Sequence, residues 1–399
     1  MTRQDRIALL KRLLGHVESR TTAMADAPWQ NAVSIYTDPE QAAKERRLFR
    51  ERPLLMGFSS EWAGEGTYRT EDLAGVPILI VRTGEGELRA FLNVCRHRGA
   101  QVAKGSGQAK LFACPYHAWT YELSGHLRGI PDERCFPGAR AERALLTQLP
   151  LCEKHGLVWV IPSPARDTAT TFDIDPWLGG LGPELRSYGF AKWSFYDRRL
   201  VPERMNWKLL VDTFHEAYHV GFLHRKSLGD ILYGNVADFE AFGLNHRLVF
   251  PRKKLERLRD QPEEDWDLMW NTTIIYSLFP NTLLMVQGDH VELVRIFPRA
   301  DRCDRAIMDL ALYVPEPPVT EERRTHWDKN MQLVLDVVTG EDFPQGRAIQ
   351  AGLTSGAQTH MIYGRNEPGM IHYHRSLRAV LADTNSSCSG ARAGAIPPV

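Results

Sequence analysis

The sequence lacks a charge imbalance. Its 399 residues carry 49 Lys and Arg against 49 Asp and Glu, and the pI is near 7.2. Proteins that bind nucleic acids or other polyanions normally present a basic stripe. A short basic run occurs at 251–260, which a solvated face or a docking site for a partner protein would explain. We therefore expect no nucleic-acid partner.

Long hydrophobic runs are also missing. No apolar stretch approaches the ~18 residues that a membrane-spanning helix needs. Residues 1–20 are charged and lack the apolar core and cleavage site of a signal peptide. The six cysteines show no framework of paired spacings, which favours a reducing compartment over a disulfide scaffold. The sequence therefore predicts a soluble, cytoplasmic protein without a membrane partner.

The pattern of residues divides the chain into four parts. Residues 1–52 read as helices, expected to pack on the larger domain that follows. Residues 53–165 consist of short apolar strands and turns, which predicts a small β-rich domain. Residues 166–385 mix helical and antiparallel-strand patterns. Residues 386–399 are rich in Gly, Ser and Pro, as is typical of a flexible tail.

Two cysteines and two histidines stand close together in the β-rich part. They form C-x-H and C-x-x-H with sixteen residues between them: Cys95, His97, Cys114 and His117. Such a set can hold zinc or an iron–sulfur cluster. In zinc fingers both cysteines usually precede both histidines, whereas here each half supplies one of each. In a Rieske [2Fe–2S] centre, one iron takes two cysteines and the other takes two histidines.

A second cluster of metal-binding residue types lies in the segment 206–224. Its histidines and acidic residues are His215, His219, His224, Asp212 and Glu216. Two histidines and one carboxylate with open positions are typical of non-haem Fe(II) oxygenases. On a regular helix His215 and His219 face the same way. His219 and His224 converge only if the helix breaks or carries a π-type turn, which Gly221 would ease. The residues alone leave this choice open.

Together the two motifs resemble the signatures of the large subunits of Rieske non-haem iron oxygenases. The second signature begins at Asn206-Trp207-Lys208 and continues with a carboxylate, two residues and a His-x4-His pair. The resemblance covers roughly residues 40–385, with the motifs in the family's order. It implies an α+β fold, with a Rieske domain at 53–165 and a catalytic domain at 166–385. The catalytic domain would be built on a large antiparallel sheet surrounded by helices.

The resemblance also implies the ligands. The [2Fe–2S] cluster would be held by Cys95, His97, Cys114 and His117. The mononuclear Fe(II) would be held by His219, His224 and a carboxylate far downstream, for which Asp342 is the best match. Glu341 is the nearest competitor and Asp336 a more distant one. Without the upstream motifs, Glu341 and Asp342 would be explained as helix N-terminal capping residues.

Other residues of the second motif are assigned to the neighbourhood of the iron. His215 is not a family ligand position and is expected in the pocket. Asp212, Phe222 and Leu223 are expected there as well. Glu216 falls on the family's bridging carboxylate, which joins a cluster histidine of one subunit to an iron histidine of the next. It would touch His117 of the partner subunit and His219 of its own chain.

This bridging role implies an assembly and electron donors. The family forms ring-shaped homotrimers, with or without a small beta subunit, in which the cluster of one chain faces the iron of the next. The sequence has no G-x-G-x-x-G nucleotide fingerprint and no additional ferredoxin-type set of cysteines. Electrons from NAD(P)H would therefore arrive through a separate reductase, a ferredoxin or both.

The resemblance implies an O₂-dependent oxygenase, and the apolar residues near the second motif predict its substrate. They favour mono- or dihydroxylation of a hydrophobic, aromatic small molecule, as in aromatic hydrocarbon catabolism. The alternative is oxidative demethylation or monooxygenation of a quaternary ammonium, methoxy or N-methyl compound. An aromatic cage would then hold the cation, with Trp270, Tyr276 and Phe279 as candidates.

Some alternatives stay open from the sequence. Four polar residues near one predicted turn could orient the substrate or merely cap a hairpin: Gln287, Asp289, His290 and Arg295. The chain could also be an electron-transfer Rieske protein with a degenerate second site. A zinc-stabilised scaffold is the third possibility.

Overall fold

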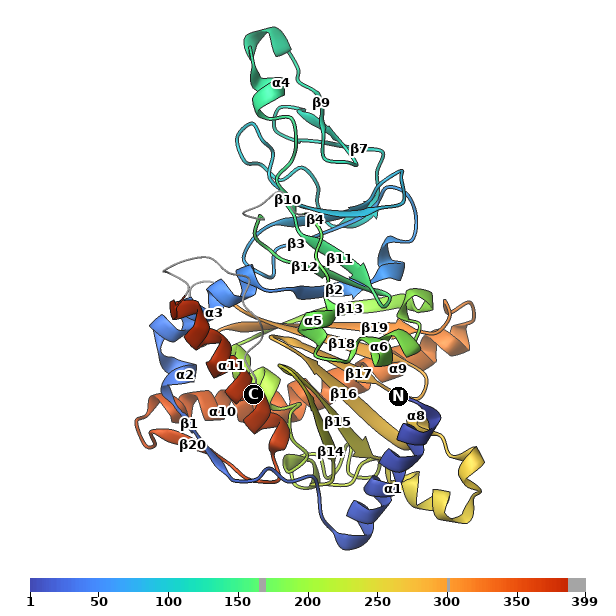
Figure 1. Cartoon of the computed structure of the whole chain (residues 1–399). Coiled ribbons are helices and arrows are strands. Elements are labelled where there is room, and N and C mark those ends of the chain that lie inside the picture. The colour runs from blue at the N-terminus through green and yellow to red at the C-terminus, as the bar shows by residue number, and fades with distance from the viewer. Residues whose placement is uncertain (165–169, 300–301, 387–399) are drawn as a thin grey trace. The chain divides into compact units, whose positions relative to one another are not determined.

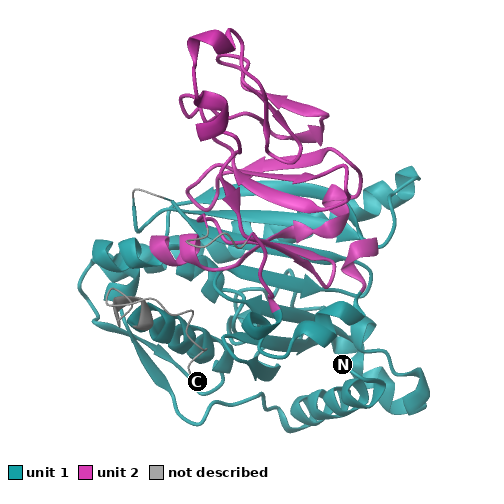
Figure 2. Ribbon diagram, turned by 45° about the horizontal axis from the view of Figure 1, so that its top comes forward, with its two compact units in different colours: residues 1–45, 175–188, 193–399 teal, residues 46–174, 189–192 magenta. Residues whose placement is uncertain are grey.

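The computed structural model describes residues 1–164, 170–299 and 302–386. They form two compact units, which Figure 2 shows in different colours. Unit 1 comprises residues 1–45, 175–188 and 193–399, and unit 2 comprises residues 46–174 and 189–192. The expected tail lies outside the described residues from 387 onward.

The boundaries between the two units differ from those expected from the sequence. The units are defined by which residues pack together, whereas the expected boundaries follow changes in the sequence pattern. The first boundary lies inside helix α3 (Pro39–Glu51), between residues 45 and 46, instead of after 52. The second lies before Asp175 instead of after 165. Residues 189–192 return to unit 2 and contain the short helix η3 (Phe190–Lys192).

Unit 2 consists of small antiparallel sheets, as the sequence predicts. The five-stranded sheet has the order β10 (Gln148–Leu149), β5 (Leu88–Leu92), β4 (Ile78–Arg82), β3 (Thr67–Glu71), β6 (Ser106–Gln108). One three-stranded sheet contains β11 (Leu151–Lys154), β12 (Leu157–Val160) and β2 (Leu54–Phe58). The other contains β7 (Leu111–Ala113), β8 (Thr120–Glu122) and β9 (Leu127–Gly129). Short helices join them: η1 (Ser59–Trp62), η2 (Glu133–Cys135) and α4 (Ala139–Glu142).

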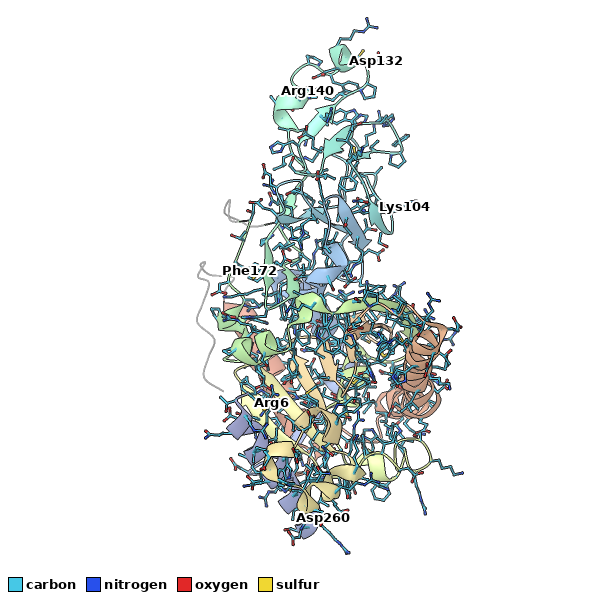
Figure 3. The ribbon with its side chains drawn as sticks, turned by 90° about the vertical axis from the view of Figure 1, so that its right-hand side faces the viewer. Arg6, Lys104, Asp132, Arg140, Phe172 and Asp260 are labelled. Atoms are coloured by element: carbon cyan, nitrogen blue, oxygen red, sulfur yellow. The ribbon has the colours of Figure 1, made fainter. Side chains whose placement is uncertain are left out.

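The hydrophobic core of unit 2 extends up to the loops that carry the first motif. Cys95 and Cys114 belong to the same buried cluster as Phe91 and Phe112. Burying one large apolar side chain stabilises a fold by ~1.5–3 kcal/mol. The buried cluster therefore stabilises the positions of the two loops that it includes. Figure 3 shows Asp132 and Arg140 near the end of this unit, where Arg140 pairs with Glu133.

Unit 1 is built on a seven-stranded antiparallel sheet, which confirms the α+β fold class. Its order is β13 (Ser194–Glu203), β19 (Ala306–Val314), β18 (Val291–Pro298), β17 (Thr282–Val286), β16 (Thr272–Leu278), β15 (Asn245–Pro251), β14 (Asp238–Phe242). Figure 1 shows the strands in this order from top to bottom. Every residue of β15, β16, β17 and β19 is buried, so both faces of the central sheet are covered. Arg295 and Asp309, opposite each other on β18 and β19, form an ion pair within it.

Helices and a two-stranded sheet surround this sheet. The longer helices are α1 (Arg3–Ser19), α9 (Glu321–Val337), α10 (Phe343–Thr354) and α11 (Pro368–Ser386). The shorter ones are α2 (Ser34–Thr37), α5 (Asp175–Leu178), α6 (Gly182–Ser187), α7 (Trp207–Asp212), η4 (His219–Gly221), η5 (Lys253–Asp260), η6 (Glu263–Asp265), α8 (Leu268–Asn271) and η7 (Val338–Asp342). Strands β1 (Trp29–Ala32) and β20 (His360–Tyr363) pair with each other. None of the helices in the described ranges combines the length and hydropathy that a membrane crossing demands.

A buried ion pair anchors α7, the helix that leads into the second motif. Lys208 donates from Nζ to both carboxylate oxygens of Glu45, each at 2.7 Å, and Trp207 Nε1 donates to the same carboxylate. Asn206 begins the helix, because its side chain accepts a hydrogen bond from the amide of Lys208. The Asn-Trp-Lys triplet is therefore a structural anchor for the metal-binding segment.

We predict that Lys208→Met lowers the free energy of unfolding by about 3–5 kcal/mol, because Glu45 would stay buried without its counter-charge. Denaturant unfolding followed by tryptophan fluorescence would measure this loss. Lys11→Met is the matched control, since Lys11 and Glu263 form an exposed pair, and such pairs contribute at most about 1 kcal/mol. Equal losses in the two variants would contradict the anchoring role.

Candidate metal centres and substrate pocket

The first motif occupies two tight loops of unit 2. In the first loop the amide of Gly99 donates to the carbonyl of Cys95, and Gly99 has a φ of 85° that favours glycine. In the second loop the amide of Ala118 donates to the carbonyl of Cys114, and Ala118 also has a positive φ. Each turn thus places one thiol and the histidine that follows it in the same loop.

The two imidazoles of these loops lie side by side. The rings of His97 and His117 are 4.6 Å apart between centroids. His97 also stacks on Trp119, with an angle of 6° between the rings, and its Nδ1 is buried without a hydrogen-bond partner. A buried nitrogen without a partner is costly unless a ligand uses it. The ring of Tyr116 also contacts His117, with 3.8 Å between centroids, and 61% of the surface of Tyr116 is exposed.

Both thiols are buried and free. Burial raises the pKa of Cys95, and the neighbouring thiol of Cys114 adds to this rise. The hydroxyl of Tyr121 accepts a hydrogen bond from the amide of Arg96, which leaves its proton to donate to Cys95 Sγ at 3.3 Å. A donor to sulfur would stabilise a thiolate there. The paired loops, free thiols and partnerless imidazole nitrogen fit a cluster held by two cysteines and two histidines.

The second motif does not form the continuous helix that its sequence suggests. Helix α7 ends at Asp212, and a new helical turn, η4, begins at His219. The reason is local: Glu216 Oε2 accepts hydrogen bonds from the amides of Tyr218 and His219. A side chain that satisfies these amides competes with helix continuation. The break resolves which histidines can converge.

Three side chains in unit 1 come together as a metal-binding group: His219, His224 and Asp342. The Nε2 atoms of the two histidines are 3.1 Å apart. Asp342 Oδ1 lies 3.2 Å from Nε2 of His224 and 3.6 Å from Nε2 of His219. This oxygen is buried and accepts no hydrogen bond. Nitrogen and oxygen donors facing one point, on one side only, fit Fe(II) with open positions.

A second carboxylate holds each imidazole from behind. Glu216 contacts Nδ1 of His219, and Glu341 contacts Nδ1 of His224 at 2.6 Å. Glu341 is fixed in turn by a hydrogen bond from Ser227 Oγ. The contacts with His224 and Ser227 lower the pKa of Glu341 despite the opposing effect of its burial. Such acceptors set the tautomer that leaves Nε2 free for metal.

The third carboxylate depends on a π-helical turn. Helix α9 continues through η7 (Val338–Asp342) into α10, with Pro344 in the first turn of α10. The widened turn lets consecutive residues serve the same site, because Asp342 faces both Nε2 atoms while Glu341 reaches behind His224. Asp336 lies on α9 and accepts a hydrogen bond from Gln332 instead.

Two glycines hold the histidine loop close to the next segment. A Cβ on Gly234 would lie 2.5 Å from the Cα of Gly221, so the two backbones can touch only without side chains. The amide of Asn235 also donates to the carbonyl of Ala217 at 2.7 Å. These contacts fix the loop between Glu216 and His224.

A cavity of about 380 Å³ opens beside the metal-binding group, between the sheet and α9. Its apolar lining consists of Phe214, Val220, Leu228, Ile231, Leu232, Phe250, Ile275, Met285, Leu333, Val334, Val337 and Val338. Trp270, which is half exposed, also lines it. Most of these side chains are aliphatic, so the wall suits a compact apolar group.

The same cavity has a polar part, lined by Arg252, Thr273, Gln287, Asp289, His290, Glu292, His326 and Asn330. His290 is at its centre, with Nδ1 2.8 Å from Asp289 and Nε2 2.9 Å from Glu292. Burial would lower the pKa of His290, but the two carboxylates outweigh it and raise that pKa to about 9. The hydrogen bond from His290 lowers the pKa of Asp289 to about 2. Near neutral pH, His290 is therefore a cation between two anions.

The four residues expected in the pocket lie elsewhere. Asp212 is buried against Tyr36 and His374, and His215 is buried with Nε2 2.9 Å from Ser277 Oγ. Phe222 is 75% exposed, and Leu223 is partly exposed without lining the cavity. Asp212 is still within α7, whereas the break that follows it changes the directions of the other three side chains from those of a continuous helix.

The candidate aromatic cage does not form either. Trp270 lines the cavity, but Tyr276 is buried beside Tyr188 and Glu184, and Phe279 lies under Trp177. Of the four polar candidates, Gln287, Asp289 and His290 line the cavity. Arg295 is committed to Asp309.

Sequence reasoning missed several residues of the cavity, most of them distant in the chain from the second motif. Arg252 and Glu292 lie at the ends of strands β15 and β18. Helix α9 contributes a stripe at helical spacing, His326, Asn330, Val334 and Val337. That spacing is the one feature of the sequence that could have indicated these cavity residues, although the same pattern is typical of an ordinary buried helix face.

Comparison with protein families matches both units. Residues 53–150 match the family described as "Rieske [2Fe-2S] domain". Residues 190–383 match the family described as "Ring hydroxylating alpha subunit (catalytic domain)". The matched ranges contain all the residues of the two metal motifs.

Two of three curated relatives match most of the chain at low identity, and the third matches about half of it. Choline monooxygenase of Atriplex hortensis is 26% identical over 87% of this chain and 77% of its own length. The carnitine monooxygenase oxygenase subunit of Escherichia coli K12 is 26% identical, over 89% of this chain and 94% of its own. Biphenyl 2,3-dioxygenase subunit alpha of Rhodococcus jostii is 33% identical, but over only 47% of this chain and 41% of its own.

A solved structure shares the fold. It is a quaternary ammonium Rieske monooxygenase in complex with an inhibitor, with a TM-score of 0.76 at 22% identity. The similarity covers 89% of this chain and 96% of that one.

Proposed function

Because the chain belongs to the Rieske non-haem iron oxygenases, as a catalytic alpha subunit, we propose that it is a monooxygenase of small quaternary ammonium compounds. The coarser activity, O₂-dependent oxygenation at a mononuclear iron, comes with the family. The relatives that match nearly the whole chain support the finer proposal, since their names specify choline and carnitine. The biphenyl dioxygenase matches only about half of the chain.

Each metal would be held by residues that the fold already places together. Cys95, His97, Cys114 and His117 would hold the cluster. His219, His224 and Asp342 would hold the iron. When bound, the cluster supplies single electrons and the iron supplies the site of O₂ activation. Glu216 and Glu341 orient the imidazoles, and the apolar wall excludes water from the substrate.

One observation carries the preference for a cationic substrate: the density of carboxylates at the metal end of the cavity. Asp342, Glu341 and Glu216 surround two imidazoles there. Three carboxylates exceed the two positive charges of Fe(II), so the bound site keeps an excess negative charge in a partly buried setting. A methylated ammonium group combines a positive charge with an apolar surface, which suits this end of an aliphatic cavity.

Hydroxylation of an aromatic compound is the second candidate. It is favoured by the many apolar side chains of the cavity, among them Phe214 and Phe250. The absence of an aromatic cage from the cavity, within the described ranges, is also compatible with a neutral substrate.

Product analysis under single-turnover conditions tests the two candidates. The metal-loaded protein, with its cluster chemically reduced, would receive isotopically labelled O₂ and one compound at a time. The panel contains choline, carnitine, glycine betaine, biphenyl and an aromatic acid. We expect one labelled oxygen atom in the product of a quaternary ammonium compound, or the dealkylated product that follows from it. Labelled product from the aromatic compounds alone would contradict the proposal and establish the second candidate.

We further propose that the active assembly is a homotrimer, with or without a small beta subunit, in which Glu216 connects neighbouring chains. Its carboxylate contacts His219 of the same chain, and it lines the cavity near the surface. Tyr218 and Phe222 beside it are at least half exposed. Tyr116 is similarly exposed next to His117. These apolar surfaces, each next to a metal ligand, support contacts between copies of the chain. A separate reductase, ferredoxin or both would supply electrons from NAD(P)H.

We predict that Glu216→Gln keeps both metals but slows electron transfer from the cluster to the iron by about tenfold to a hundredfold. Glutamine retains an oxygen that can accept from His219, while the charge is lost. Rapid-mixing absorption spectroscopy of the cluster after O₂ addition would measure the rate. Asp336→Asn is the control, because that carboxylate is exposed and contacts only Gln332 among the described side chains. An unchanged rate in Glu216→Gln with intact metals would exclude the bridging role.

A further inference from the structure

Arg252 is fixed by its backbone at the end of strand β15. Its amide donates to the carbonyl of Asn271 at 2.9 Å, and the residue forms a β-bridge with Leu232. It is two residues from Phe250, so the two side chains share a face of the sheet, and both line the cavity. The position of the guanidinium is therefore set by the sheet and not by a mobile loop.

The guanidinium has an unusual set of partners. Its Nη2 donates to Oε1 of Gln287 at 2.6 Å, and the same oxygen accepts from Thr273 Oγ1. Its Nε is buried without any hydrogen-bond partner. Within the described ranges no carboxylate lies within ion-pair distance of Arg252. A buried donor on a cation is costly to leave unsatisfied, which suggests a ligand for it.

The nearby carboxylates are already in use. Asp289 and Glu292 contact the two ring nitrogens of His290, and Asp289 also contacts His326. The oxygens of both acids that face His290 are thus occupied, and the two acids act on Arg252 only from beyond ion-pair distance. Burial lowers the pKa of Arg252 more than the two acids raise it, although a guanidinium stays charged at physiological pH. Among the described residues, the guanidinium of Arg252 is therefore a cation in the polar part of the cavity with no ion-pair partner and with a buried, unused Nε donor.

This polar part and the metal-binding group lie at opposite ends of the cavity, as the path of α9 shows. His326, which contacts Asp289, is near the beginning of the helix. Val334 and Val337, further along the helix, line the apolar wall of the cavity. Asp342 lies in the π-helical turn that follows the helix. A substrate between the two ends meets a cation at one end and the iron site at the other.

We propose that Arg252 binds the carboxylate of the substrate, so that the substrate is an organic acid whose opposite end is oxidised at the iron. This inference rests on the proposed function and narrows it: a quaternary ammonium substrate would be a zwitterion, with its ammonium toward the acidic metal end. The planar guanidinium matches the two oxygens of a carboxylate through paired N–H donors, which an ammonium group would not reproduce.

Binding measurements on matched pairs of ligands test this assignment. One pair is carnitine and its primary amide, and the other is an aryl-propionic acid and its primary amide. Isothermal titration calorimetry on the metal-loaded protein would use wild type, Arg252→Gln, Arg252→Lys and Lys253→Gln. Lys253 is the matched control, because it is the next residue and also a cation, but it is exposed and outside the cavity. Cluster absorption and iron content verify that each variant is folded.

For wild type we expect the acid of at least one pair to bind about tenfold to a hundredfold more tightly than its amide. Arg252→Gln should abolish this preference by weakening the acid alone, Arg252→Lys should restore part of it, and Lys253→Gln should keep it. The inference is overturned if neither acid is preferred. It is also overturned if Arg252→Gln weakens acid and amide equally, as a purely structural contact with Gln287 would.

The two pairs separate this inference from the proposed function. A preference that depends on Arg252 and appears only with the aryl pair supports the inference and contradicts a quaternary ammonium substrate. Tight binding of carnitine amide as well as carnitine, unaffected by Arg252→Gln, overturns the inference and leaves the proposed function standing.

Discussion

The catalytic unit depends on one geometric constraint: two imidazoles must turn their Nε2 atoms toward the same carboxylate oxygen. Glu216 and Glu341 meet this constraint by taking Nδ1 of His219 and His224. Other features keep these contacts in register. The buried pair of Lys208 and Glu45 fixes α7, the close glycines hold the histidine loop, and the π-helical turn brings Asp342 opposite. The loss of any of these contacts would shift the ligands of the iron.

The same constraint shapes the chemistry of the cavity. Carboxylates that orient the imidazoles gather negative charge at the metal end. In the polar part, Asp289 and Glu292 contact His290, and Arg252 keeps a buried Nε without a hydrogen-bond partner. Between them lies an aliphatic wall. A molecule with a polar head and a compact apolar end can satisfy both ends at once. This distribution of charge favours one orientation of a bound molecule, which an apolar pocket alone would not do.

The sequence predicts the fold class and the two metal motifs well, because ligand spacing and residue type are local properties. The direction of side chains in an irregular segment is not local. Asp212 and His215 were expected in the pocket, but Asp212 is buried against His374 at the end of α7, and His215 is buried beside Ser277 where the chain has left the helix. The choice between Glu341 and Asp342 depends on a π-helical turn, for which Pro344 was only an indirect sign. Arg252 could not be found, because strand order decides which distant residues share a cavity.

The central claim is that His219, His224 and Asp342 form the iron site. The most direct test compares the mononuclear iron signal of wild type with that of variants that each lack one carboxylate. Nitric oxide added to the anaerobic, reduced protein gives an EPR signal from mononuclear iron. We predict this signal for wild type and Asp336→Ala, and its loss in Asp342→Ala with the Rieske cluster signal unchanged. A full iron–nitrosyl signal in Asp342→Ala would contradict the account, and its absence from metal-replete wild type would do so more severely.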